Sequence, residues 1–133
     1  MFLCDTNIIS ELARRQPNPK VVTWARGVSD VFLSVVTVEE IYYGLAWKPN
    51  DRIERWFENF WRSHCQILPV TNAIAQTSGQ LRGHLQQQGK TRSQPDMLIA
   101  ATAKVHQLTL VTHNIKDFED CQILLFDPFH YSP

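Results

Sequence analysis

The stretch Met97-Leu-Ile-Ala-Ala-Thr-Ala-Lys-Val105 is apolar around nearly its whole circumference when it is wound as a helix. A helix without a polar face is covered by neighbours on every side, so this pattern predicts a central, buried helix. Leu108 to Thr112 follows it, a short run rich in β-branched residues that predicts a strand. A buried helix followed by a buried strand indicates a layered α/β structure.

Four other short apolar runs also predict strands, and segments with helical spacing lie between them. The five predicted strands are Met1 to Cys4, Val31 to Val36, Gln66 to Val70, Leu108 to Thr112 and Ile123 to Phe126. Because strands alternate with helices, we expect a mainly parallel sheet that helices cover on both faces. No repeat, low-complexity tract or long linker interrupts this pattern, so we expect one domain over residues 1–133.

Three segments carry signals for the start of a helix. Asp51 and Glu54 have the spacing of a capping box, and an amphipathic pattern follows them. Thr71 precedes a second helical pattern and predicts its N-cap. Ser93 stands three residues before Asp96, which predicts an N-terminal cap for the central helix.

The composition is that of an ordinary globular protein. Apolar residues make up 44% of the chain and charged residues 20%, and thirteen basic residues balance thirteen acidic ones. Net charge therefore gives no sign of a nucleic-acid partner. No apolar run is long enough to span a membrane and the first residues lack a signal-peptide pattern, so we expect a cytoplasmic protein without membrane contact. Three cysteines without a close pair predict reduced thiols.

Three acidic residues stand at the ends of predicted elements. Asp5 directly follows the first strand, and Asp117 follows the strand of residues 108–112 through a short turn. Ligands of parallel α/β sheets bind at the carboxyl ends of the strands, so both positions suggest a site. Asp96 opens the central helix, where the helix dipole favours a carboxylate. Taken alone, Asp5 can equally be a helix cap.

A fourth acid, Glu40, lies in a helix predicted from about Thr37 to Trp47. On the helical wheel it lies away from the main core face, so its spacing alone predicts a solvent-exposed side chain. The predicted core face consists of Val38, Ile41, Tyr42 and Leu45.

Carboxylates without a nearby histidine or cysteine partner suit Mg²⁺ or Mn²⁺ better than zinc. Metal ions held by such a cluster can generate a hydroxide nucleophile and stabilise the leaving oxygen of a phosphodiester. Thr112 and Asn114 can bond water or a substrate oxygen, although local turn bonds are the alternative. Lys90 and Arg92 lie in a polar loop that leads into Asp96, where they either contact a nucleic-acid backbone or are merely solvated.

Four motifs, in order and spread over nearly the whole chain, resemble those of PIN-domain ribonucleases of the VapC and FitB type. The motifs are Leu3-Cys-Asp5-Thr-Asn7, Ser34-Val-Val-Thr-Val-Glu-Glu40-Ile-Tyr-Tyr-Gly44, Asp96-Met-Leu-Ile-Ala-Ala-Thr-Ala103 and Val111-Thr-His-Asn-Ile-Lys-Asp117-Phe118. Members of this family are toxins of bacterial and archaeal toxin–antitoxin pairs. The resemblance implies a parallel sheet of four or five strands and a metal-dependent endoribonuclease that uses Mg²⁺ or Mn²⁺.

The resemblance also assigns site residues. The acidic site corresponds to Asp5, Glu40, Asp96 and Asp117, and the polar residues beside it to Thr6, Thr112 and Asn114. Glu40 is preferred over Glu39 because it fits the Glu-x-x-x-Gly pattern. The family usually has arginine where this chain has His113, which puts any substrate contact of that arginine in doubt here.

The resemblance further implies a homodimer, an RNA substrate, and a small antitoxin that blocks activity and contacts promoter DNA through its other end. Aromatic side chains on two successive helices fit such contacts, because a chain of this size does not easily bury them all. They are Trp56, Phe57, Phe60 and Trp61 together with Tyr42, Tyr43 and Trp47. Packing in the core is the alternative for part of this set.

Two other functions stay open from the residues. A phosphohydrolase with Asp5 as covalent nucleophile also places an Asp after the first strand, but the usual Asp-x-Asp pattern is Asp5-Thr6-Asn7 here. A catalytically silent module that binds nucleic acid or protein is the second alternative. Cleavage of RNA that depends on metal separates it from the enzyme.

Overall fold

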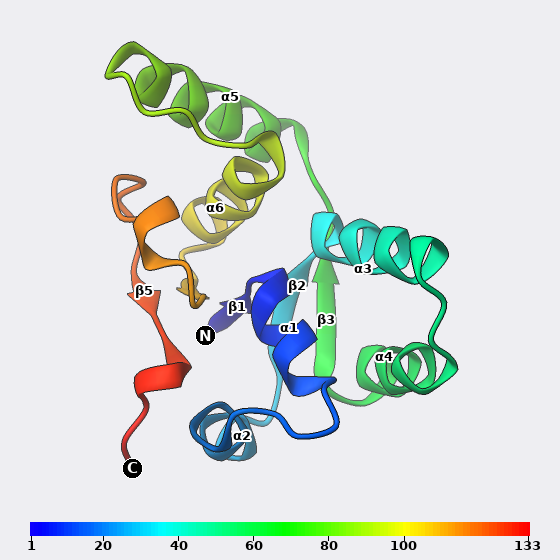
Figure 1. The fold of residues 1–133 in the computed structure, drawn as a ribbon. Helices are drawn as coiled ribbons and strands as arrows, with labels where there is room; N and C mark the ends of the chain where they lie inside the picture. Colours follow the sequence, from blue (N-terminus) through cyan, green and yellow to red (C-terminus); the bar gives the residue numbers. More distant parts are fainter.

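The computed structural model describes residues 1–133 and contains one five-stranded sheet (Figure 1). The strands are β1 (Phe2–Cys4), β2 (Val31–Ser34), β3 (Cys65–Leu68), β4 (Thr109–Val111) and β5 (Leu125–Phe126). All neighbouring strands are parallel, in the order β3-β2-β1-β4-β5. The predicted parallel α/β class is therefore confirmed, and each of the five predicted runs contains or overlaps a strand.

The strand order reverses direction at β1. The chain leaves β1 for β2 and then β3 on one side, and later returns to place β4 and β5 on the other side. Leu3 pairs with Phe32 of β2, and Cys4 pairs with Val111 of β4. A parallel sheet opens a crevice at such a switch point, just beyond the carboxyl ends of the strands. Asp5 directly follows β1 at this place.

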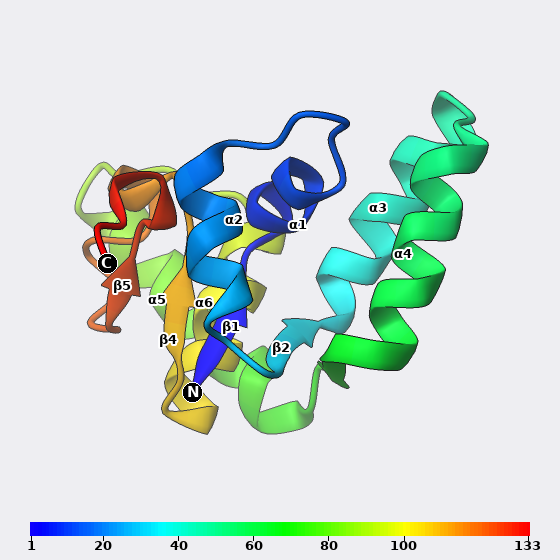
Figure 2. The same ribbon diagram turned by 90° about the horizontal axis from the view of Figure 1, so that it is seen from below.

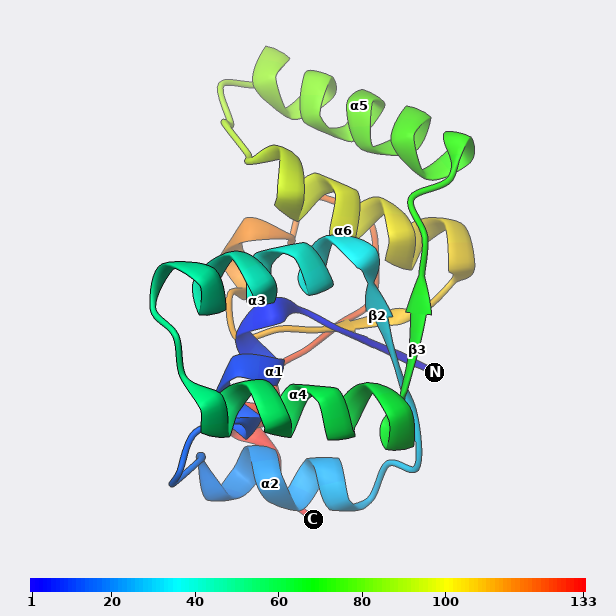
Figure 3. The ribbon, with the colours of Figure 1, turned by 90° about the vertical axis from the view of Figure 1, so that its right-hand side faces the viewer.

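Six α-helices cover the two faces of the sheet. They are α1 (Thr6–Leu12), α2 (Pro19–Arg26), α3 (Val35–Trp47), α4 (Asp51–His64), α5 (Asn72–Gln87) and α6 (Gln94–His106), and two short 3₁₀ turns, η1 (Ile115–Asp117) and η2 (Pro128–His130), follow. One core cluster joins the sheet to α1, α2 and α4, and a second joins it to α5 and α6. The two layers lie on opposite sides of the strands (Figures 2 and 3).

The helix of residues 94–106 is as buried as its sequence predicts. Met97, Ile99 and Ala100 are fully buried, and α5 lies outside α6, so that α6 is enclosed between α5 and the sheet (Figure 3). The predicted caps at Thr71 and Ser93 are confirmed, because their hydroxyl oxygens accept hydrogen bonds from the first turns of α5 and α6.

Two predicted boundaries are wrong. The strand predicted to run to Val36 ends at Ser34, whose hydroxyl accepts a bond of 3.1 Å from the Val36 N–H and starts α3 there. The capping box at Asp51 is displaced by one residue, because the Asn50 side chain accepts a bond of 3.0 Å from the Ile53 N–H. In both cases a small polar side chain competes successfully for the free amides of a helix start.

The aromatic set divides between core and surface. Phe57 is buried at 3% exposure, whereas Tyr43 and Trp47 of α3 are 64% and 69% exposed. Tyr42 was expected on the core face of α3 but is 38% exposed, and its hydroxyl accepts a bond of 3.3 Å from the Trp61 indole N–H of α4. Core packing thus accounts for part of the aromatic set and leaves an exposed group on α3.

All three cysteines are free thiols, and burial raises the pKa of Cys65 to about 12. The thiols therefore stay protonated near neutral pH, as expected for inert structural cysteines. No helix has the length and apolar character needed to cross a membrane.

Candidate active site

A polar cleft of about 510 Å³ opens at the carboxyl end of β1, at the switch point of the sheet. No hydrophobic residue lines it. The lining residues are Asp5, Thr6, Asn7, Ser10, Glu11, Arg14, Glu40, Asp96 and Asn114. Segments far apart in the sequence thus meet here, and three of the four predicted acids are among them.

Asp5 lies at the bottom of this cleft and is only 5% exposed. Its Oδ1 accepts a hydrogen bond of 2.8 Å from the Thr6 N–H, so the residue is the N-cap of α1. Its Oδ2 accepts bonds from the Thr112 hydroxyl at 2.9 Å and from the Asn7 side-chain amide at 3.2 Å. The sequence left open whether Asp5 caps a helix or belongs to a binding site. In the structure its side chain caps α1 and also lies in the cleft.

The surroundings of Asp5 disfavour its charge. Burial raises the pKa of Asp5 to about 6, and the nearby negative charges of Asp96 and Glu40 add to this effect. The hydrogen bonds from Thr112 and Thr6 act in the opposite direction but do not cancel the burial. A bound cation offsets the cost of ionising this buried carboxylate. A buried acid beside other acids is therefore a favourable position for a metal ligand.

Glu40 turns toward the cleft from the second turn of α3. Its Oε1 accepts a hydrogen bond of 2.7 Å from the Thr6 hydroxyl, and the buried Thr37 hydroxyl lies 3.0 Å from the same Thr6 oxygen. The neighbouring Glu39 is exposed. The helical wheel predicted Glu40 to be solvated, and this is wrong in one respect: the side chain faces a polar cleft, which the wheel cannot distinguish from open solvent.

Asp96 reaches the cleft from the first turn of α6, where its N–H donates to the Ser93 hydroxyl at 3.2 Å. Burial raises the pKa of Asp96, while the Ser93 hydrogen bond lowers it. The charge of Asp117 raises it further, and the charge of Arg92 lowers it. Asp117 is therefore near enough to Asp96 for their charges to interact.

Asp117 itself does not line the cleft; it closes the η1 turn beside it. Arg92 holds this turn from the loop before α6, because its Nε donates 3.1 Å to the Asp117 carbonyl oxygen. A second guanidinium nitrogen of Arg92 donates to the Lys116 carbonyl oxygen at 3.5 Å and lies 3.7 Å from Asp120. Lys90 is also bound to Asp120, at 3.1 Å. Neither basic side chain lines the cleft, and their contact with substrate stays a prediction.

Thr112 and Asn114 link the end of β4 to the β1–α1 turn. The buried Thr112 hydroxyl donates to Asp5 and accepts a bond of 3.0 Å from the Asn114 N–H. The Thr112 hydroxyl therefore uses its donor and an acceptor position within the protein. Asn114, by contrast, lines the cleft. His113, which replaces the arginine usual in the resembling family, is bonded at 3.0 Å to Asp127, and its ring lies 3.9 Å from that of Phe129.

The donor chemistry of the cleft suits a hard divalent cation. No group of three or more His, Cys, Asp or Glu side chains is arranged to hold a metal ion by itself. Mg²⁺, however, usually keeps several waters and binds through one or two carboxylates, with hydroxyl and amide oxygens near by. Asp5, Glu40 and Asp96 around a polar cavity, with Thr6 and Asn114 beside them, provide such a set.

The sequence analysis overlooked the contribution of α1. Asn7, Ser10, Glu11 and Arg14 line the cleft, and none of them was singled out as a site residue. Their spacing of three, four and seven residues from Asn7 puts them on one side of a helix that begins after Asp5. That polar stripe is the signal that identifies them.

Comparison with known proteins identifies the family of the chain. The family model described as "PIN domain" matches residues 2–123. The chain is 36% identical to the protein named Toxin FitB from Neisseria gonorrhoeae, over 98% of this chain and 99% of that protein. It is 31% identical to Ribonuclease VapC2 from Haemophilus influenzae, over 89% of each chain.

A solved structure gives the same picture in three dimensions. The crystal structure of FitAcB from Neisseria gonorrhoeae contains a chain with a TM-score of 0.86 to this one, at 36% identity. The alignment covers 98% of this chain and 100% of that chain. A structure of FitAB bound to an IR36 DNA fragment matches with a TM-score of 0.84 at 34% identity, over 100% of this chain and 99% of that one.

Proposed function

The chain belongs to the PIN-domain family, and we propose that it is a Mg²⁺- or Mn²⁺-dependent endoribonuclease that acts in the cytoplasm as the toxin of a toxin–antitoxin pair. The observation that carries this proposal is the convergence of Asp5, Glu40 and Asp96 on one polar cleft at the switch point of the sheet. The relatives named as a toxin and as ribonucleases support it, because they align over most of their own length.

In this proposal the chain's own residues hold and orient the reacting groups. Asp5, Glu40 and Asp96 hold the cation, one or two of them by direct bonds and the remainder through its bound waters. Thr6 fixes Glu40 through its hydroxyl, and Thr112 fixes Asp5, so the acids keep their orientation before substrate arrives. A bound divalent ion supplies positive charge to the phosphodiester and makes a water more acidic.

Asp117 has a different role from the other three acids. It stands on a turn beside the cleft and interacts with Asp96 only through its charge. We assign it to an outer position, through a water or a second, weaker ion. Lys90 and Arg92 then serve substrate binding indirectly, because they hold Asp120 and the turn that carries Asp117.

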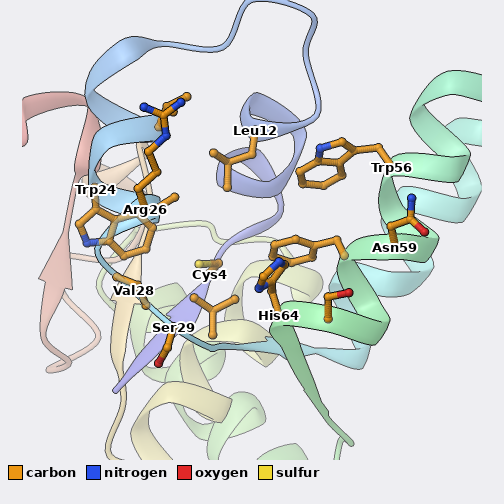
Figure 4. A pocket seen from close by; sticks show the side chains of 14 residues that line it. Cys4, Leu12, Trp24, Arg26, Val28, Ser29, Trp56, Asn59 and His64 are labelled. Atoms are coloured by element: carbon orange, nitrogen blue, oxygen red, sulfur yellow. The ribbon is translucent and has the colours of Figure 1, made fainter.

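We expect the antitoxin to bind a second cavity, separate from the acidic cleft. An apolar groove of about 670 Å³ lies between α2 and α4 and extends down to Cys4 of β1 (Figure 4). Leu12, Trp24 and Trp56 point into it. Solved relatives are described as FitAB and VapBC complexes, so we assign the groove to an amphipathic segment of the cognate antitoxin. Promoter DNA is contacted only through that partner, which agrees with the zero net charge of this chain.

A homodimer is the second expected contact. Tyr43 and Trp47 are exposed on α3, with ring centroids 6.2 Å apart, and both stay largely exposed although the Lys48 ammonium lies 4.9 Å from the centroid of the Trp47 ring. Exposed aromatic clusters are typical of protein interfaces. We assign this cluster to a second copy of the chain.

Cleavage of RNA by the purified chain tests the enzyme assignment. Wild type is expected to cut single-stranded RNA with Mg²⁺ or Mn²⁺ and to be inactive in EDTA, whereas Asp5→Asn is inactive in both. Asp30→Asn is the matched control, because Asp30 is an exposed acid outside the cleft. Folded wild-type protein without metal-dependent cleavage, or an active Asp5→Asn, contradicts the proposal. Sequencing the ends of the cleaved RNA identifies the target.

A further inference from the structure

Arg14 is the only basic residue that lines the acidic cleft. It stands just after the C-terminal end of α1, and its side chain is 66% exposed. One guanidinium nitrogen, Nη1, donates to both oxygens of Glu11 at 3.1 and 3.2 Å. The remaining donors of the guanidinium make no hydrogen bond within the protein. They are therefore free for a ligand in the cleft.

The partner of Arg14 is fixed, unlike the partners in an ordinary surface ion pair. Glu11 is only 9% exposed, and its Oε2 also accepts a bond of 2.8 Å from the Asn18 backbone N–H. The chain between them is held a second time, because Arg52 of α4 donates to the Ala13 carbonyl oxygen at 2.9 Å. The backbone on both sides of Arg14 is therefore held by hydrogen bonds. This lowers the conformational entropy that Arg14 loses when it binds a ligand.

The position of Arg14 determines which part of a substrate it can reach. Asp5 is the N-cap of α1 and Arg14 follows the C-cap Ala13, so a seven-residue helix about 10 Å long separates their backbones. Arg14 therefore stands at the far end of the cleft from the buried Asp5. It can contact another phosphate of the same strand, where the planar guanidinium offers two parallel hydrogen bonds.

We propose that Arg14, positioned by Glu11, binds a backbone phosphate of the RNA strand next to the one that is cleaved. This inference rests on the proposed ribonuclease function and adds to it a protein cation that leads the strand along α1 into the cleft. A strand that approaches three carboxylates and Glu11 meets repulsion at every phosphate that no cation neutralises. The metal ions neutralise the reacting phosphate, and Arg14 neutralises a neighbouring phosphate.

The test compares Arg14→Gln, Arg14→Lys and the control Arg15→Gln, which removes the adjacent exposed charge outside the cleft. The substrate is a labelled single-stranded RNA of mixed sequence with Mn²⁺. Arg14→Gln is expected to raise KM about tenfold, the equivalent of one charged hydrogen bond, with kcat nearly unchanged. The slope of log binding constant against log salt should fall by about 0.7, the value for one phosphate of a single strand.

The two other variants separate charge from geometry. Arg14→Lys keeps the salt dependence but loses the paired hydrogen bonds, so its KM should lie between those of wild type and Arg14→Gln. Arg15→Gln should match wild type. An equal loss in Arg15→Gln, or a fall in kcat without a change in KM or in the salt slope, overturns the proposal. Wild type that neither binds nor cuts RNA overturns the ribonuclease function itself, and the role of Arg14 with it.

Discussion

Replacing Asp5 with asparagine should stabilise the metal-free protein at neutral pH while it abolishes activity. The folded protein raises the pKa of Asp5 from 3.8 to about 6, mainly through burial. A shift of this size corresponds to about 3 kcal/mol of stability lost once the group is ionised. Asparagine carries no charge, but the amide group that replaces Oδ2 no longer accepts the bonds from Thr112 and Asn7, which costs about 2 kcal/mol. The net gain at pH 8 is about 1 kcal/mol.

The sign of the effect depends on pH in a defined window. Below about pH 3 Asp5 is neutral in both the folded and the unfolded protein, so wild type keeps its full stability there. As pH rises from about 4 to about 6 the unfolded chain releases its proton first, and wild type loses stability relative to the variant. The two stability curves should therefore separate within this window and run parallel above it.

Urea unfolding in EDTA at several pH values measures this difference. At pH 8 the Asp5→Asn midpoint should lie above that of wild type, and at pH 3 it should lie below, because only the two lost hydrogen bonds then separate the proteins. Added Mg²⁺ should stabilise wild type and leave the variant unchanged, because a ligand stabilises only the form that binds it. An Asp5→Asn protein that is less stable than wild type at pH 8 in EDTA would refute the claim that burial of this charge is costly.

Three further results are expected. Asp117→Asn should lose about 10- to 100-fold in activity and recover partly with added Mn²⁺, whereas Asp96→Asn should lose far more; equal, unrescued losses in RNA cleavage would put Asp117 among the direct ligands. Arg92→Gln should speed hydrogen exchange in residues 115–118, because the carbonyl oxygens of the η1 turn lose their donor; unchanged exchange rates would exclude the clamp. Trp47→Ala should lower the mass seen by light scattering at micromolar concentration, and a monomeric wild type would contradict the dimer.

The fold was predictable because its inner strands and its central helix are largely buried. The run Val31-Phe-Leu33 is apolar without alternation, which is the pattern of a parallel strand covered on both faces. Boundaries were harder to predict where a strand passes directly into a helix. Val35 and Val36 have the composition of a strand, and only the hydroxyl of Ser34 ends the strand and begins α3.

The site was predictable in its acids and less so in its basic residues. Asp5, Glu40 and Asp96 meet in one cleft, and their role as metal ligands stays a prediction. Lys90 and Arg92 were expected either to contact a nucleic-acid backbone or to be solvated, and the sequence did not indicate their bonds to Asp120 and the η1 turn. A sequence shows which charges exist but not which opposite charges they face across the fold, and the bond between Lys90 and Asp120 joins residues thirty positions apart.

In the proposed ribonuclease, the order of the strands also determines when the nuclease site forms during synthesis of the chain. Thr112 bonds to Asp5 across 107 positions, and β1 is flanked on one side by β4, one of the last strands to be made. While the ribosome is still synthesising the middle of the chain, Asp5 has neither its hydroxyl partner nor Asp96 and Asn114 beside it. The nascent chain therefore carries no assembled cleft until nearly all of it has left the exit tunnel. An antitoxin that recognises the groove of α1, α2 and α4, whose elements all precede residue 65, can bind before the cleft is complete.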